Sequence, residues 1–246
     1  MIAHSIRAVL FDVDDTLVDH EAAQRAGIQA QLGLSGEPLD ESVHRRWKAH
    51  VDASFARYLA GELSFVDQRR ERARAMTGQA MTDAEADEWI AGTVQGFEAG
   101  LRAFDDVLPT LTRLAEAGVR LGAFSNVNGD FTRRKLGLVG LADRFDVVLG
   151  DDDVGAAKPA PEPFLALCVA LGVEPAEAVH VGDRWLADVV GARAAGLTGV
   201  WLSRPGLDPT GRVPDAAHPA DPSVPVISTL AELPALLPLT PHPHPR

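Results

Sequence analysis

Two aspartates follow an apolar segment near the start of this sequence. Residues 6–11 are mostly apolar and are typical of a short buried strand, and Asp12 and Asp14 come at its end. Side chains alternate along a strand, so we expect the two carboxylates on the same side, roughly 6–7 Å apart. Like charges at a buried strand end cost on the order of several kcal/mol unless a metal ion or a catalytic task offsets that cost. The pattern therefore favours an enzyme that works through carboxylates.

Composition limits the partners and the compartment. The 246 residues are 46% hydrophobic and 24% charged, which is ordinary for a globular protein with ample core material. Acidic residues outnumber basic ones by 35 to 23, and a formal charge of -12 argues against a nucleic-acid polymer or an anionic membrane as the main partner. The single cysteine, Cys168, permits no internal disulfide. The N-terminus lacks a basic segment followed by an apolar one, and no apolar run could span a bilayer, so we expect a soluble cytoplasmic protein.

Four further segments are typical of strands, and helical patterns alternate with them. The strands are expected at residues 119–125, 145–150, 178–182 and 198–202. Helices are expected before Gly118, at 161–171 before Gly172, and at 188–195 before Gly196. A last short strand and helix are expected within 226–237. This order predicts an α/β fold, a Rossmann-like parallel sheet with helices on both faces, with its site at the carboxyl ends of the strands.

The stretch from about residue 18 to residue 104 has no convincing strand and carries a helical pattern. Its apolar anchors are expected to be Trp47, Phe55, Tyr58, Leu59, Leu63, Phe65 and Trp89. Its arginines alternate with acids and predict a solvated helix face: Arg45, Arg46, Arg57, Arg69, Arg70, Arg72 and Arg74. We interpret residues 18–104 as an inserted α-helical cap domain and residues 1–17 with 105–237 as the α/β core. Residues 205–225 are expected to form a loop, and residues 238–246 a disordered tail.

Most of the expected strands end in a polar residue that chemistry could use. These residues are Asp12 and Asp14 after the first strand, Ser125 and Asn126 after the second, Lys158 beyond the third, and Asp183 after the fourth, with Asp188 five residues further on. Carboxylates, a hydroxyl and a lysine at one sheet edge suit a phosphate and a divalent cation. Oxygen ligands favour a hard ion such as Mg²⁺, and the sequence has no Cys/His cluster of the kind that holds zinc.

Taken together, these segments resemble the haloacid dehalogenase-like (HAD) hydrolase superfamily, in the phosphatase branch with a helical, C1-type cap. The resemblance covers residues 7–237. It rests on residues 12–16 (DxDxT), on Ser125-Asn126, on Lys158 followed by proline, and on residues 182–188 (GDxxxxD). Each segment is weak alone, but four in order at strand ends are specific. The sequence departs from many relatives at Asp15, where they have glycine.

The resemblance implies a nucleophile and an acid–base pair. Asp12 would attack phosphorus and form an aspartyl-phosphate intermediate. Asp14 would protonate the leaving oxygen and then act as base toward water, and Lys158 would neutralise charge on the nucleophile and the transferring group.

It also implies two sets of ligands. Magnesium would be held by Asp12, the backbone carbonyl of Asp14, and Asp183, with Asp188 supporting through water or Lys158. The phosphate and the substrate would be bound by Thr16, Ser125, Asn126 and Lys158.

We therefore expect a magnesium-dependent phosphatase acting on a small phosphomonoester such as phosphoglycolate, a sugar phosphate or a nucleotide. Its partner would be this small molecule, and the protein would be a monomer or a homodimer. Carbon–halogen hydrolysis on the same scaffold is an alternative, although dehalogenases of the superfamily lack the aspartate at position 14. A non-catalytic binding or regulatory module is another. Thr16 favours hydrolysis over a mutase, which usually has Val or Ala there.

Structural roles compete with several of these assignments. Asp183 and Asp188 could cap a helix and interact with its dipole. The acidic run 151–153 is expected to be a solvated loop, and His180 a packed strand residue.

Overall fold

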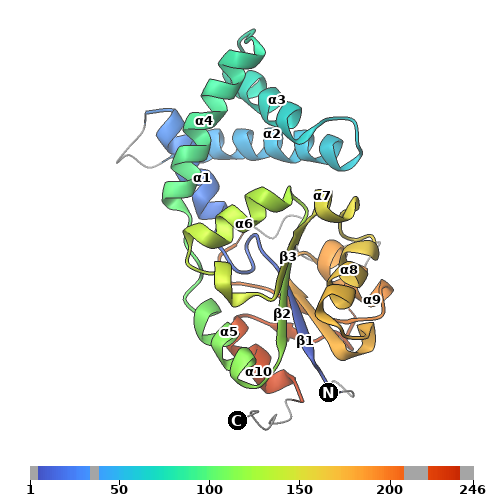
Figure 1. Cartoon of the computed structure of the whole chain (residues 1–246). Helices are drawn as coiled ribbons and strands as arrows, with labels where there is room; N and C mark the ends of the chain where they lie inside the picture. Colours follow the sequence, from blue (N-terminus) through green and yellow to red (C-terminus); the bar gives the residue numbers. More distant parts are fainter. Residues whose placement is uncertain (1–4, 34–38, 208–220, 239–246) are drawn as a thin grey trace. The chain divides into compact units, whose positions relative to one another are not determined.

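Six parallel strands form one sheet in the order β3-β2-β1-β4-β5-β6 (Figure 1). The computed structural model describes residues 5–33, 39–207 and 221–238. The strands are β1 (Ala8–Asp12), β2 (Arg120–Ser125), β3 (Val147–Gly150), β4 (Ala178–Gly182), β5 (Thr198–Leu202) and β6 (Val226–Ile227). The predicted parallel Rossmann-like sheet is confirmed, including its short last strand.

Helices cover both faces of this sheet (Figure 1). They are α5 (Val107–Glu116), α6 (Gly129–Leu138), η1 (Ala142–Arg144), α7 (Asp151–Val154), α8 (Glu162–Leu171), η2 (Pro175–Glu177), η3 (Trp185–Val190), α9 (Gly191–Ala194), η4 (Leu230–Glu232) and α10 (Leu233–Leu236). Helix α8 packs Phe164 and Leu167 against Leu10 of β1 and Phe124 of β2, and α5 lies on the opposite face. The helix ends follow the predicted signals, since α8 ends at Gly172 with φ 65°.

Three predicted boundaries are wrong in ways that affect the site. The first strand starts at Ala8 rather than at residue 6 and includes Asp12, but Asp14 lies beyond it. The helix expected from Asp188 begins earlier, because the π-helical turn η3 runs from Trp185 to Val190 and leads into α9. The acidic run 151–153 forms the start of α7 instead of a loop.

The chain divides into two compact units, and helices make up the described part of the unit His20–Arg102. The helices are α1 (His20–Gln31), α2 (Glu41–Leu59), α3 (Phe65–Thr77) and α4 (Asp83–Gly100). One buried hydrophobic cluster of this unit contains Ile28, Trp47, Ala73, Met76, Ala86 and Ile90. The other unit, Met1–Asp19 with Ala103–Arg246, contains the sheet.

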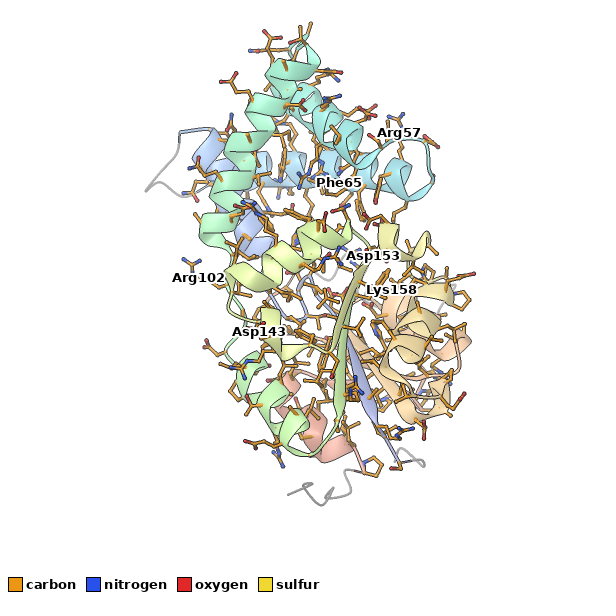
Figure 2. All side chains as sticks on the ribbon, in the orientation of Figure 1. Arg57, Phe65, Arg102, Asp143, Asp153 and Lys158 are labelled. Atoms are coloured by element: carbon orange, nitrogen blue, oxygen red, sulfur yellow. The ribbon has the colours of Figure 1, made fainter. Side chains whose placement is uncertain are left out.

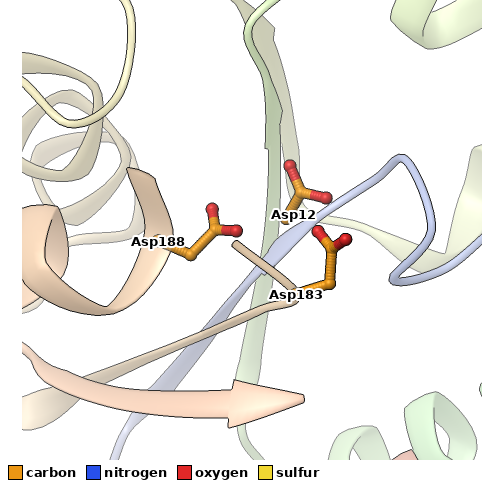
Figure 3. A group of neighbouring side chains, drawn as sticks. All are labelled: Asp12, Asp183 and Asp188. Atoms are coloured by element: carbon orange, nitrogen blue, oxygen red, sulfur yellow. The ribbon is translucent and has the colours of Figure 1, made fainter. Parts of the chain in front are cut away.

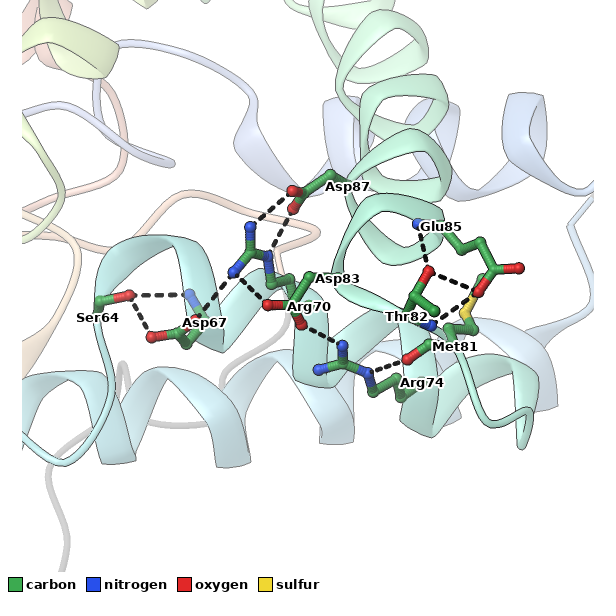
Figure 4. A network of polar contacts seen from close by, with 9 residues as sticks. All are labelled: Ser64, Asp67, Arg70, Arg74, Met81, Thr82, Asp83, Glu85 and Asp87. Carbon is green, nitrogen blue, oxygen red and sulfur yellow. Dashed lines mark hydrogen bonds and ion pairs between the residues drawn. The ribbon is translucent and has the colours of Figure 1, made fainter.

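Part of the expected arginine face, Arg70 and Arg74, forms a network of ion pairs (Figure 4), whereas Arg69 and Arg72 are partly buried rather than solvated. Arg70 donates to both carboxylate oxygens of Asp87 at 2.8 and 2.7 Å, and Arg74 contacts Asp83. The prediction that Leu59 is an apolar anchor is wrong, because this residue at the end of α2 is 43% exposed. The predicted tail at 238–246 and the centre of the predicted 205–225 loop lie mostly outside the described residues. Among the described helices, none combines the length and the apolar character that a membrane span requires.

Candidate active site

Asp12 is the last residue of β1, and it lies opposite Phe124 of β2 in a central position of the sheet. The chain then turns sharply, because Asp15 adopts a left-handed conformation with φ 59° and its N–H donates to the carbonyl of Val18 at 2.8 Å. Aspartate tolerates this region better than most residues, which explains how it can occupy a position that needs a positive φ. Asp14 lies between the end of the strand and this turn.

Three buried aspartates converge at this sheet edge (Figure 3). Asp12 lies at the end of β1, Asp183 directly follows β4, and Asp188 lies in η3. One carboxylate oxygen from each can be chosen so that all three lie within 4.8 Å of one another. The side chain of Asp14 is not part of this group, and its expected metal ligand was the backbone carbonyl.

Lys158 lies between the carboxylates of two of these residues. Its Nζ is 2.6 Å from Oδ1 of Asp12 and 2.7 Å from Oδ1 of Asp188. The segment that carries it, between α7 and α8 (Figure 2), is fixed by the side-chain amide of Asn126. Asn126 donates to the carbonyl of Lys158 and accepts from its N–H, both at 2.8 Å. Asn126, expected near the substrate, thus holds the lysine in place.

Asp188 is held from several directions. Its Oδ2 accepts from the backbone N–H of Arg184 at 2.9 Å. Its Oδ1, already bonded to Lys158, also accepts from Nε2 of His180 at 3.1 Å. His180 is fully buried in β4, and burial lowers the pKa of its ring, so the neutral ring donates to the carboxylate. His180 is therefore a packed strand residue, as predicted, and in addition orients Asp188.

The electrostatics of the group fit a divalent cation. Burial, together with the neighbouring Asp188, Asp183 and Asp14, raises the pKa of Asp12 to about 8, although Lys158 opposes this shift. Asp188 is also buried, but Lys158 and His180 outweigh the burial and hold its pKa well below the usual range. Burial would lower the pKa of Lys158, yet Asp12 and Asp188 raise it. With all three acids ionised, three carboxylates face one ammonium group, so two further positive charges would neutralise the cluster and favour the ionised form of Asp12. Oxygen ligands of this kind suit Mg²⁺.

A second buried lysine at this edge was missed by sequence analysis. Lys135 of α6 places Nζ 2.5 and 2.6 Å from the two oxygens of Asp14, and Oγ of Ser125 donates to Oδ2 of Asp14 at 3.0 Å. A signal existed, because Lys135 lies between Thr132 and Leu136 on the buried stripe of α6, where an apolar residue is expected.

Thr16 is buried, and its Oγ1 has no hydrogen-bond partner among the described residues. Its carbonyl accepts from Nη2 of Arg204 at 2.9 Å. Arg204 donates to both oxygens of Asp106 at 2.9 Å, which places a bidentate ion pair beside the turn. Arg204 was also absent from the predicted set.

The acidic run fixes the loops beside Ser125. Asp152 accepts from the N–H of Gly129 at 2.7 Å, and Asp153 accepts from the N–H of Gly150 and from Arg133, both at 2.9 Å. These bonds join the segment after β2 to the segment after β3. The acidic run therefore stabilises the loops next to Ser125.

Comparisons with known proteins agree with this arrangement. A family model described as haloacid dehalogenase-like hydrolase matches residues 6–196. The chain is 34% identical over 209 residues to a glyceraldehyde 3-phosphate phosphatase of Methanopyrus kandleri, covering 81% of this chain and 84% of that protein. It is 34% identical over 203 residues to a phosphoglycolate phosphatase of Yersinia pseudotuberculosis, covering 81% and 82%. Among solved structures, a 2-haloacid dehalogenase of Pseudomonas syringae pv. Tomato shares 30% identity with a TM-score of 0.65, covering 94% and 97%.

Proposed function

Since the chain belongs to the haloacid dehalogenase-like hydrolase family, we propose that this hydrolase is a magnesium-dependent phosphatase that transfers a phosphoryl group from a small monoester to Asp12. The observation that carries the proposal is the arrangement of Asp12, with its carboxylate against Lys158 and beside Asp183. An anionic nucleophile can approach an anionic ester when nearby positive charge offsets the repulsion. Here an ammonium group contacts the buried carboxylate, and the further acids can hold a cation beside it.

The first step forms a covalent intermediate. A carboxylate oxygen of Asp12 bonds to phosphorus in line with the leaving oxygen, and the bond from phosphorus to that oxygen breaks. The ammonium group of Lys158 offsets charge on Asp12 and the transferring group. The carboxyl of Asp14 gives its proton to the leaving oxygen, which departs as an alcohol.

The second step hydrolyses the phosphorylated enzyme and regenerates its free form. Asp14, now a carboxylate, takes a proton from water while the water oxygen bonds to phosphorus and the bond to Asp12 breaks. Inorganic phosphate is released, and the two carboxyl groups are back in their starting states. Ser125 lies next to Asp14, and when substrate binds its single hydroxyl proton can turn from Asp14 to a phosphoryl oxygen.

Asp12, Asp183 and the backbone carbonyl of Asp14 would hold the magnesium ion, with Asp188 acting through Lys158. When bound, the ion supplies positive charge and orients the phosphoryl group. Asp188 suits the supporting role, since Lys158, His180 and the N–H of Arg184 already use both of its oxygens.

The substrate is proposed to be a small phosphorylated metabolite, with the helical unit His20–Arg102 acting as the cap that selects it. The named activities of the two curated relatives, on glyceraldehyde 3-phosphate and phosphoglycolate, support phosphomonoesters of this size. The test is phosphate release from a panel of phosphoglycolate, glyceraldehyde 3-phosphate, sugar phosphates and nucleotides with Mg²⁺. We expect release that stops on chelation and in Asp12→Asn. Equal release by Asp12→Asn would overturn the assignment.

Carbon–halogen hydrolysis is the second candidate, because a 2-haloacid dehalogenase is among the similar structures. Asp14 counts against it, since the acid and base of the phosphatase route have no task in displacing a halide. Release of halide from a 2-haloacid in the presence of a chelator would favour the dehalogenase over the phosphatase.

A further inference from the structure

Asp14 is held by a buried lysine to which the proposed mechanism assigns no task. The side chain of Lys135 is 0% exposed, whereas that of Asp14 is 21% exposed. The ammonium group contacts both carboxylate oxygens, at 2.5 and 2.6 Å, and Ser125 donates to one of them. Two donors from separate elements, α6 and the end of β2, therefore fix one carboxyl group.

Packing alone does not account for this lysine. An ammonium group is expensive to bury, and apolar residues of similar volume often replace buried ion pairs with no loss of stability. Helix α6 already buries Gly129, Thr132 and Leu136, so a methionine at position 135 would fill this buried stripe without a charge. What a methionine could not do is hold the carboxyl group of Asp14.

We propose that Lys135 is a positioning residue that orients the carboxyl group of Asp14 for proton transfer. The inference rests on the proposed function and adds a residue to it. Asp14 must meet the leaving oxygen in the first step and a water molecule in the second. A carboxyl group held by both oxygens reaches these atoms without first losing rotational freedom, and small misplacements at such distances are costly in rate.

The dependence of rate on the leaving group tests this role. 4-Nitrophenyl phosphate and phenyl phosphate are similar in shape, but the nitrophenolate leaves readily without a proton, whereas phenolate benefits from an acid. kcat/KM reports the step that breaks the bond to the leaving group. Since general acids contribute typically about 10²–10⁴-fold, Lys135→Met should lower kcat/KM for phenyl phosphate roughly 10–100-fold and for 4-nitrophenyl phosphate less than about threefold.

Three further variants separate positioning from folding. Lys135→Arg keeps a cation that can bond both oxygens and should restore most of the phenyl phosphate activity. Leu136→Ala weakens the packing of the same helix but leaves both residues of the ion pair in place, so it should lower kcat/KM for both esters by the same factor. Asp14→Asn combined with Lys135→Met should be no worse than Asp14→Asn alone, because the two residues act as one unit. If Lys135→Met does not fold, Lys135→Gln serves in its place with the same expectation.

The outcomes distinguish the two proposals. Equal losses on both esters in Lys135→Met, or a multiplicative loss in the double variant, would overturn the role of Lys135 while leaving the phosphatase proposal intact. If the unaltered protein releases phosphate from neither these aryl esters nor the metabolite panel with Mg²⁺, the proposed function fails, and the role of Lys135 fails with it.

Discussion

Gly182 and Asp188 lie so close together that a methyl group on Gly182 would be 2.2 Å from Cγ of Asp188. No side chain fits there, because real Cβ atoms do not approach another carbon at that distance. The last residue of β4 is therefore glycine so that the carboxylate of η3 can turn toward Lys158.

Gly182→Ala is predicted to displace the carboxylate of Asp188 and to lower activity at least about tenfold, since small misplacements of catalytic groups cost this much or more. Phosphate release at saturating Mg²⁺ measures the effect. Gly137→Ala in α6 is the matched control, because a methyl group there meets nothing within 4 Å and alanine favours the helix. Equal activity of the two variants would contradict the packing argument.

Lys158→Met is predicted to lower kcat/KM by at least about 100-fold, the loss typical when one donor to a developing charge is removed. The variant should also unfold at a lower temperature, because it leaves the buried Asp12 and Asp188 without their cation. Lys48→Met is the control, since the ion pair of Lys48 with the exposed Asp52 spans 3.5 Å in the helical unit, whereas the acidic group belongs to the other unit. Wild-type activity in folded Lys158→Met would exclude the proposed role of the lysine.

His180→Phe is predicted to raise the Mg²⁺ concentration that gives half-maximal activity roughly tenfold, the size of effect expected when a group behind a metal ligand is lost. The physical reason is that His180 orients Asp188 and through it Lys158. His44→Phe provides a matched buried histidine in the helical unit and should leave this concentration unchanged. A lower melting temperature of His180→Phe with an unaltered Mg²⁺ requirement would mean that His180 only packs.

The Asp106–Arg204 pair is predicted to stabilise the protein in a pH-dependent way. Burial opposes ionisation of Asp106, but bonds from Arg204 and Thr229 outweigh it and lower its pKa below the ordinary value of 3.8. A pKa lowered by folding gives stability that is present above 3.8 and is lost as the pH falls through the folded value. Asp106→Asn should therefore lower the melting temperature at pH 7, and the difference from the unaltered protein should shrink below pH 3.8.

A control for this pH dependence is Asp130→Asn, whose side chain is 90% exposed beside Arg133. Exposed pairs contribute little, so its melting temperature should match that of the unaltered protein at either pH. A melting-temperature difference for Asp106→Asn that stays constant with pH would show that the charge of Asp106 contributes nothing.

The sequence predicted the sheet well because its strands are short apolar segments with polar ends. The bounds expected for β4 and β5 are those observed, and Asp12, Ser125 and Asp183 do end or directly follow strands. Periodicity failed where the backbone departs from regular geometry. Strand β1 ends at Asp12, so Asp14 lies beyond the regular strand, and the π-helical η3 places Asp188 inside a helical turn rather than at its start.

Contacts between segments that are far apart in the sequence could not be predicted from the sequence alone. Lys135 and Asp14 are 121 residues apart, and Arg204 and Asp106 are 98 apart, so only folding shows that they pair. The motif containing Lys158 pointed to that lysine because family members share its spacing. Lys135 belongs to no such motif, and its one signal in the sequence is a charged residue on the buried stripe of a helix.

The most direct measurement of the central claim is chemical trapping of the enzyme during turnover. The protein is mixed with 4-nitrophenyl phosphate and Mg²⁺, quenched in acid and reduced with borohydride, which converts an acyl phosphate to an alcohol. Peptide mass spectrometry should then find homoserine at position 12, absent when chelator replaces Mg²⁺ and absent in Asp12→Asn. Rapid release of phosphate with a phosphoryl group trapped on any other residue would contradict the account.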